Sequence, residues 1–114
     1  LVDGSVRVAE LITHRLPWQP DRRPGITYKM LHTYQHERVS LERWEGEVII
    51  DYPALPGGLE LFVLEGSLRD ADTEYPAGSW CRYPPGAAPR LSAGPSGVKM
   101  YVKRGHLSNA LCDV

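Results

Sequence analysis

The sequence predicts an all-β domain built as a sandwich or a barrel, and three observations support this prediction. Eleven glycines and ten prolines among 114 residues leave little room for long helices. Turn signals such as Leu55-Pro56-Gly57-Gly58 separate the apolar segments of the chain. Those segments, rich in Val, Ile, Leu, Tyr and Trp, recur at about the spacing of strands in a sandwich, at 26–34, 38–44, 47–52, 59–65, 79–83 and 97–103.

The first 25 residues do not follow this strand pattern. Residues 6–16 are compatible with either a helical turn or an edge strand, and their sequence does not separate the two. Trp18 is followed by two prolines, which favours an extended arm that packs on the barrel with the indole as its anchor. We therefore expect an N-terminal arm over residues 1–25 and a single domain over residues 26–114.

The last predicted strand shows the clearest alternation in the chain. Val98, Met100 and Val102 fall on one face of an extended segment, whereas Lys99 and Lys103 fall on the other. This pattern is typical of an antiparallel strand with one buried and one solvent-facing side.

The composition excludes several classes of protein. Thirteen Lys and Arg residues against fourteen Asp and Glu give a net charge of −1, unlike the basic surface of a nucleic-acid-binding protein. No segment approaches the roughly 20 apolar residues of a membrane helix, and the N-terminus lacks the layout of a signal peptide. Two cysteines, Cys81 and Cys112, are too few for a disulfide framework and indicate reduced thiols. We expect a cytoplasmic domain with neither nucleic acid nor a membrane as its partner.

Two segments carry a resemblance to a known family. Residues 53–66, PALPGGLELFVLEG, resemble the first cupin motif, which places two histidines and a glutamate ahead of a glycine. Residues 78–89, GSWCRYPPGAAP, resemble the second motif, in which a Pro-X-Gly turn precedes a histidine. The Pro-Gly-Gly and Val-Leu-Glu-Gly segments are most similar to ChrR-type cupins, and the resemblance covers about residues 16–104. It implies a cupin-type double-stranded β-helix, a jelly-roll barrel of the RmlC-like kind.

The resemblance also implies four metal-ligand positions, and this chain departs from the family at each of them. The motif spacing assigns the first two histidine positions to Pro53 and Leu55, the glutamate position to Leu59 and the last histidine position to Pro89. Proline and leucine side chains carry no donor atom, whereas divalent metals need imidazole, carboxylate or thiolate ligands. We therefore expect no metal and no other cofactor, and an apolar ligand pocket at these former metal positions.

Neighbouring acidic and histidine residues do not replace these ligands. Glu60 is expected to face away from Leu59, because successive side chains of a strand point to opposite faces. His32 and His36 share a face of one strand, but an extended strand separates them by about 13 Å. His36 is also expected at an exposed hairpin tip.

Arg82, Tyr52 and Arg43 flank the motif segments and are the candidate polar residues of the pocket. The family usually carries an arginine at the position of Arg82, where a guanidinium would pair with a carboxylate or an anionic ligand. The alternative is that Arg82 orders the loop at 84–86. No catalytic residue is assigned, because no nucleophile elbow is present and Cys81 is expected to be a core residue of a strand.

The resemblance implies either a metal-dependent dioxygenase that cleaves diketone-type substrates or the zinc-binding cupin portion of an anti-sigma regulator. Both roles depend on the metal, so the residues favour a cupin that binds a small apolar or aromatic molecule or serves as a sensory or structural module. Two alternatives remain: a dioxygenase-type enzyme with a relocated site, and a structural partner domain. Trp18, Trp44 and Phe62 are expected to supply apolar surface for a homodimer.

Overall fold

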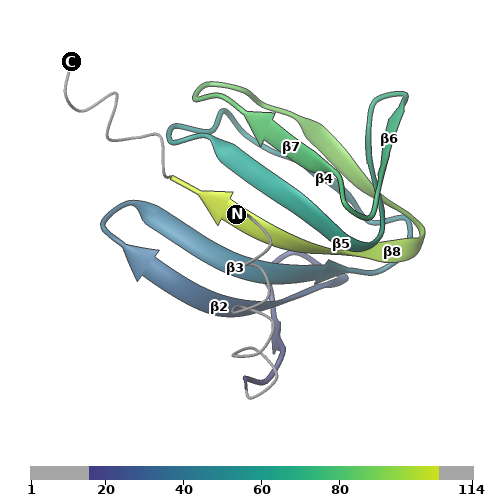
Figure 1. Cartoon of the computed structure of the whole chain (residues 1–114), viewed down its shortest axis with the longest axis horizontal. Helices are drawn as coiled ribbons and strands as arrows, with labels where there is room; N and C mark the ends of the chain where they lie inside the picture. Colours follow the sequence, from purple (N-terminus) through teal and green to yellow (C-terminus); the bar gives the residue numbers. More distant parts are fainter. Residues whose placement is uncertain (1–15, 106–114) are drawn as a thin grey trace.

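The computed structural model describes residues 16–105, and every regular element within them is a β-strand (Figure 1). The strands are β1 (Gln19–Pro20), β2 (Ile26–Tyr34), β3 (Glu37–Trp44), β4 (Ile49–Asp51), β5 (Leu59–Asp70), β6 (Thr73–Pro76), β7 (Trp80–Tyr83) and β8 (Arg90–Arg104). The prediction of an all-β jelly roll is confirmed. The part of the chain that the structure describes contains no helix able to cross a membrane.

The six predicted strand segments correspond to β2, β3, β4, β5, β7 and β8, but two of them are longer than expected. β5 continues past residue 65 to Asp70, and β8 begins at Arg90 instead of 97. Both extensions run through glycines, which are typical of strand ends and turns in a sequence. In the folded chain these glycines lie at bends inside long strands.

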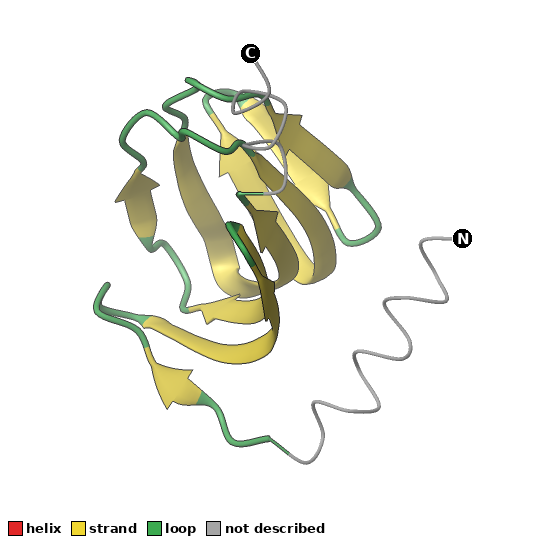
Figure 2. Ribbon diagram, turned by 90° about the vertical axis from the view of Figure 1, so that its left-hand side faces the viewer, coloured by secondary structure: helices red, strands yellow, loops and turns green. Residues whose placement is uncertain are grey.

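The two long strands hold the fold together. β5 and β8 pair antiparallel from Leu59 opposite Arg104 to Asp70 opposite Leu91. The second half of β8 also pairs with β3, followed by β2 and β1, whereas its first half pairs with β4. β5 pairs with β7 through its first half and with β6 through its second. A single antiparallel sheet therefore curls on itself through β5 and β8, and Figure 2 shows the resulting curvature.

The bend of the sheet depends on close approach of glycine backbones. The register of β5 on β8 shifts between Gly66 and Leu68, and Gly66 and Gly97 have φ angles of +76° and +87°. A Cβ atom at Gly66 would overlap the carbonyl of Gly97, and one at Gly97 would lie 2.6 Å from the carbonyl oxygen of Trp44. Only glycine satisfies both the left-handed conformation and this spacing.

The core lies inside the curled sheet, where side chains of β3, β5, β7 and β8 meet. Val98, Met100 and Val102 are 3%, 0% and 0% exposed, which confirms the alternation predicted for this strand. Lys99 and Lys103 face outward and form ion pairs with acidic residues at 3.5 Å and 3.9 Å. The other core residues are Ile26, Trp44, Tyr52, Leu59, Leu61, Val63, Leu68, Cys81, Leu91 and Ala93.

Cys81 is a core residue of β7, as predicted, with 6% of its surface exposed. Burial raises the pKa of its thiol, and the negative charge of Asp70 raises it further. The thiol therefore remains protonated near neutral pH and is a poor nucleophile. Cys112, His14 and His106 lie outside the described residues.

The structure corrects the prediction for Trp44, which was expected at a dimer surface. Trp44 is 1% exposed and belongs to the core, because it points to the inner face of β3 together with Ser40 and Glu42. Trp18 instead lies on the outer face, where the Lys29 ammonium is 4.7 Å and the Arg43 guanidinium 4.2 Å from its ring centroid. Two cation–π contacts thus hold the indole on the sheet.

We predict that Gly66→Ala lowers the free energy of unfolding by about 2–4 kcal/mol, because the new Cβ combines a strained φ with overlap of a neighbouring backbone. Gly78→Ala is a matched control: its φ is +94°, but no heavy atom lies within 4 Å of the added Cβ. That control should lose only about 1 kcal/mol. Urea denaturation measures the free energy of unfolding of both variants. Equal losses of stability would contradict the proposed role of backbone packing at the bend.

Candidate functional site

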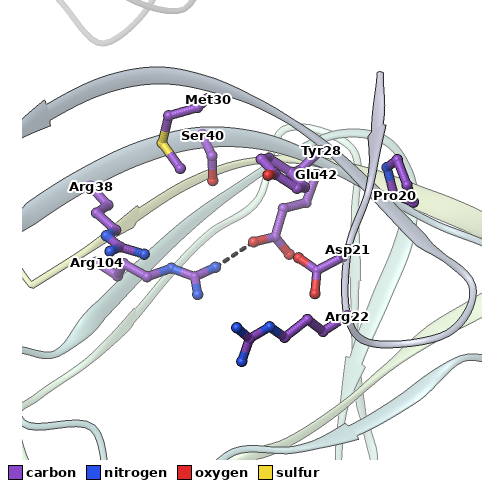
Figure 3. Close-up of a pocket in the computed structure, with 9 residues that line it drawn as sticks. All are labelled: Pro20, Asp21, Arg22, Tyr28, Met30, Arg38, Ser40, Glu42 and Arg104. Atoms are coloured by element: carbon purple, nitrogen blue, oxygen red, sulfur yellow. Dashed lines mark hydrogen bonds and ion pairs between the residues drawn. The ribbon is translucent and has the colours of Figure 1, made fainter. Parts of the chain in front are cut away.

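The inner face of β3 carries a buried carboxylate, Glu42, with 2% of its surface exposed. The Trp44 indole N–H donates to Glu42 Oε1 at 2.9 Å, and Arg23 Nη2 lies 3.3 Å from the same oxygen. The second carboxylate oxygen, Oε2, accepts a hydrogen bond from Arg104 Nη2 (Figure 3). Such a charge is stable inside a protein only when it is paired in this way.

Three separate parts of the chain bring these partners together. Glu42 and Trp44 are two residues apart in β3 and therefore share its inner face. Arg104 lies at the end of β8, directly opposite Arg38 in the register of β3 on β8. Arg23 belongs to the loop between β1 and β2.

Asp21 fixes the position of Arg23. Its carboxylate accepts hydrogen bonds from the Arg23 backbone N–H, Nε and Nη2, each at 3.0 Å. The hydrogen bond from the Arg23 side chain lowers the pKa of Asp21. Burial alone would lower the pKa of Arg23, but the bond to Asp21 and the charge of Glu42 outweigh burial and raise it. Both residues therefore stay charged at neutral pH, and the loop presents a fixed guanidinium to Glu42.

A polar cavity of about 470 Å³ opens beside Glu42 on the inner side of β2 and β3 (Figure 3). Its wall contains three arginines and two carboxylates, together with the Ser40 and Tyr28 hydroxyls. The complete set of lining residues is Pro20, Asp21, Arg22, Tyr28, Met30, Arg38, Ser40, Glu42 and Arg104.

A second, apolar cavity of about 280 Å³ lies on the side of β4. Its lining residues are Arg23, Ile50, Asp51, Tyr52, Pro53, Leu55, Leu59 and Arg104. Arg104 borders both cavities, so the ion pair between Arg104 and Glu42 lies where the polar cavity adjoins the apolar one.

Tyr52 supplies a hydroxyl to the apolar cavity. Its ring is buried, and Arg23 Nη1 lies 3.5 Å from its oxygen. Burial raises the pKa of Tyr52 to about 12, with a further contribution from the negative charge of Glu42. The phenol is therefore protonated at neutral pH and can donate a hydrogen bond.

Three of the four positions that the motif spacing assigns to metal ligands line this apolar cavity: Pro53, Leu55 and Leu59. Pro89 is not among the lining residues, but its carbonyl oxygen accepts a hydrogen bond from the Tyr52 backbone N–H at 3.0 Å. The Leu55 N–H likewise donates to the Ala87 carbonyl at 2.9 Å. The loops of the two motifs are thus joined through backbone groups.

Two of the candidate polar residues lie elsewhere. Arg43 stacks on Trp18 at the outer face of the sheet, as described above. Arg82 is exposed on β7, opposite Glu60 in the register of β5. Glu60 accepts a hydrogen bond from the Trp80 indole N–H at 2.7 Å on this outer face, which confirms that it faces away from buried Leu59. Of the three polar candidates, only Tyr52 lines the apolar cavity.

The side chains around this cavity do not fit a metal ion. Pro53, Leu55 and Leu59 offer only hydrocarbon, and the adjacent guanidinium groups of Arg23 and Arg104 would repel a cation. Among residues 16–105, no three His, Cys, Asp or Glu side chains lie close enough together to hold a metal. His32 and His36 are both exposed, the latter in the turn between β2 and β3 as expected.

Glu42, Arg23 and Arg104 were not predicted as site residues from the sequence. One local signal was present: Glu42 lies two residues before Trp44, so a carboxylate shares a strand face with a large apolar side chain. The partners of Glu42 carried no such signal, because Arg104 is 62 residues away and meets it only after β3 and β8 have paired.

We predict that Glu42→Ala lowers the free energy of unfolding by about 3 kcal/mol, because Arg23 and Arg104 lose their buried counter-charge. This is the low end of the usual range, since both arginines keep some contact with water. Glu60→Ala is the matched control, because Glu60 also accepts an indole N–H but does so at the surface, where about 1 kcal/mol or less is expected. Urea denaturation of both variants tests this, and similar losses would show that Glu42 is not an essential buried charge.

Comparison with solved structures shows the same architecture. Rhodobacter sphaeroides SigE in complex with the anti-sigma ChrR matches with a TM-score of 0.72 and 18% identity, over 91% of this chain and 67% of that one. An acetylacetone dioxygenase from Acinetobacter johnsonii matches with a TM-score of 0.68 and 16% identity, over 76% and 66% of the two chains. A protein of unknown function with a cupin-like fold from Ralstonia eutropha has a TM-score of 0.65 and 11% identity, over 70% and 54%.

These identities show a shared fold, and this chain spans only about half to two thirds of the length of those three structures. Comparison with curated proteins finds no relative. The model of one family, described as the ChrR Cupin-like domain, matches residues 7–108. The match covers nearly the whole sequence, and the curled antiparallel sheet and the hydrogen-bonded motif loops agree with it. This chain therefore belongs to the ChrR cupin-like domain family.

Proposed function

We propose that this chain is a cupin module that binds a small apolar or aromatic molecule without a metal ion. The observation that supports this proposal is the apolar cavity of about 280 Å³, where Pro53, Leu55 and Leu59 occupy positions at which the cupin motifs place metal ligands. Replacing imidazole and carboxylate groups with hydrocarbon turns a coordination site into an apolar binding surface.

The cavity has the size and chemistry for such a ligand. An apolar protein cavity of about 150 Å³ accepts a benzene ring, so this one has room for a small aromatic body. The Tyr52 hydroxyl and the guanidinium groups of Arg23 and Arg104 provide a polar wall. These groups would orient a ligand whose apolar part lies against Leu55, Leu59 and Ile50.

A second candidate function is a sensory or structural module that contacts another protein. The similarity to the SigE–ChrR complex favours it, since the match extends over 91% of this chain. A ligand-binding cupin and a protein-contacting module are compatible, because a ligand that stabilises one conformation also changes the affinity for a partner.

The dioxygenase-type alternative with a relocated metal site has weaker support. The similarity to the acetylacetone dioxygenase concerns the fold. Within residues 16–105 the donor groups needed for a relocated site are not gathered in any cluster of three.

We predict that Ile50→Trp abolishes the binding of phenol or indole in ligand-observed NMR, because the new side chain fills the apolar cavity. Ile49→Trp is the control, since Ile49 is 56% exposed in the same strand and does not line the cavity. Leu55→Trp provides a second filling variant, and circular dichroism confirms that each variant is folded. Unchanged binding in both filled variants, or a stoichiometric metal retained by the purified wild-type chain in elemental analysis, would refute the proposed function.

We also propose that the chain forms a homodimer through the outer face of β5, β7 and β8. Phe62 and Trp80 pack edge-to-face there, with ring centroids 5.8 Å apart, and Tyr101 is the register neighbour of Phe62. Trp80 is 47% exposed, so this aromatic surface reaches solvent in the single chain. Trp18 lies on the outer face of the same sheet, over Lys29 of β2 and Arg43 of β3.

We predict a mass of about twice 12.8 kDa in light scattering at high micromolar concentration. Trp80→Glu should shift the mass to that of a single chain, because it places a charge in the apolar contact. Tyr34→Glu changes another exposed aromatic residue, at 61% exposure, outside this surface and should leave the mass unchanged. A single-chain mass for the wild type would rule out the dimer.

A further inference from the structure

Two exposed arginines of the polar cavity have no ion-pair partner within the described part of the chain. Arg22 follows β1 and Arg38 lies in β3, and both guanidinium groups line the cavity (Figure 3). Neither side chain forms a hydrogen bond or an ion pair within residues 16–105. By contrast, the two carboxylates of the cavity, Asp21 and Glu42, already accept from Arg23 and Arg104.

A buried hydroxyl in the same wall is also without a partner. Ser40 is 4% exposed, lines the cavity, and makes no side-chain hydrogen bond within the described part of the chain. A ligand that fills the cavity and accepts a hydrogen bond from Ser40 would gain a contact that no protein group of the described residues already uses.

The charges of the cavity select the sign of that ligand. Three arginines and two carboxylates line the wall, and the carboxylates are neutralised by guanidinium groups that already contact them. Figure 3 shows Arg22 and Arg38 on opposite sides of Arg104, with Ser40 above Arg104 in this view. Within the described residues, the cavity groups without a protein partner are therefore hydrogen-bond donors, and the guanidinium groups of Arg22 and Arg38 are also cationic.

We propose that this cavity binds the oxyanion group of a small molecule, a carboxylate or a phosphate, between Arg22 and Arg38, with the Ser40 hydroxyl as a further donor. The planar guanidinium presents paired N–H groups that match the two oxygens of such an anion. The site is separate from the apolar cavity of the proposed function. Arg104 borders both cavities, so a ligand in either of them would lie next to its guanidinium.

Isothermal titration with inorganic phosphate and, separately, with benzoate tests the proposal on the full chain. At least one of the two anions is expected to bind, and Arg22→Gln or Arg38→Gln should weaken its binding about tenfold. Arg69→Gln is the control, because Arg69 lies on β5 outside both cavities, and it should bind as the wild type does.

Ser40→Ala separates a binding role from a structural one. This variant should lower the affinity for the anion about fivefold, because one hydrogen-bond donor is lost. The melting temperature without ligand should stay equal or rise, because the variant removes an unpartnered buried hydroxyl. A purely structural Ser40 would instead lower the melting temperature and leave the affinity unchanged.

The two anions identify the source of the oxyanion, and Ile50→Trp keeps this proposal distinct from the proposed function. Benzoate binding that Ile50→Trp weakens, with phosphate binding unaffected, supports a carboxylate whose ring lies in the apolar cavity. Anion binding that depends on Arg38 but not on Ile50 supports the anion site alone, and phenol or indole binding then decides the apolar site separately. Absence of binding by either anion, or equal losses in Arg38→Gln and Arg69→Gln, overturns the anion site.

Discussion

The carboxylate of Glu42 lies inside the barrel with 2% of its surface exposed, and its charge has to be balanced there. Arg104 comes from the end of β8 and Arg23 from the loop after β1, so one buried anion joins three distant parts of the chain. Removing a single partner from such a cluster leaves an uncompensated charge in a poorly hydrated environment. The positions of the β1–β2 loop and of the end of β8 are therefore linked to Glu42.

The same ion pairs divide the interior of the barrel into two chemically different spaces. On one side lies the apolar wall of Ile50, Leu55 and Leu59, and on the other a wall where Arg22 and Arg38 have no ion-pair partner among residues 16–105. Arg104 contributes to both sides. Small-molecule sites commonly combine a mainly apolar surface with a few fixed polar groups, and this arrangement has both elements side by side.

Backbone contacts join the two motif loops of this chain and shape the bend of its sheet. The Leu55 N–H donates to the Ala87 carbonyl, and the Gly86 N–H donates to the Leu55 carbonyl, so the two motif loops meet through backbone hydrogen bonds. At the bend, Gly66 and Gly97 allow backbones to approach at distances that no side chain permits. These backbone contacts hold the motif loops and the bend without relying on the side chains at the motif positions.

Much of the fold could be predicted from the sequence, because it depends on local periodicity. The alternation of Val98, Met100 and Val102, the core position of Cys81 and the outward direction of Glu60 all follow from the two-residue repeat of a strand. The cupin resemblance rested on turn-forming glycines and prolines, whose conformational preferences are also local. The continuation of β5 and β8 through glycine was not predictable in this way, since only pairing with the other long strand keeps such a residue extended.

The residues of the candidate site also differ in whether the sequence could predict them. Motif spacing indicated Pro53, Leu55 and Leu59, which line one cavity, and Tyr52 beside them. Arg43 and Arg82 are near the motifs in the sequence but lie on the outer face, because strand register and not sequence distance decides where a side chain points. Glu42 and Arg104, 62 residues apart, form their ion pair only because β3 pairs with β8 and turns both side chains inward. The sequence by itself determined the strands, the turns and the apolar character of the motif positions, whereas the tertiary structure decided which charges meet, because charge pairing depends on distances that no local pattern encodes.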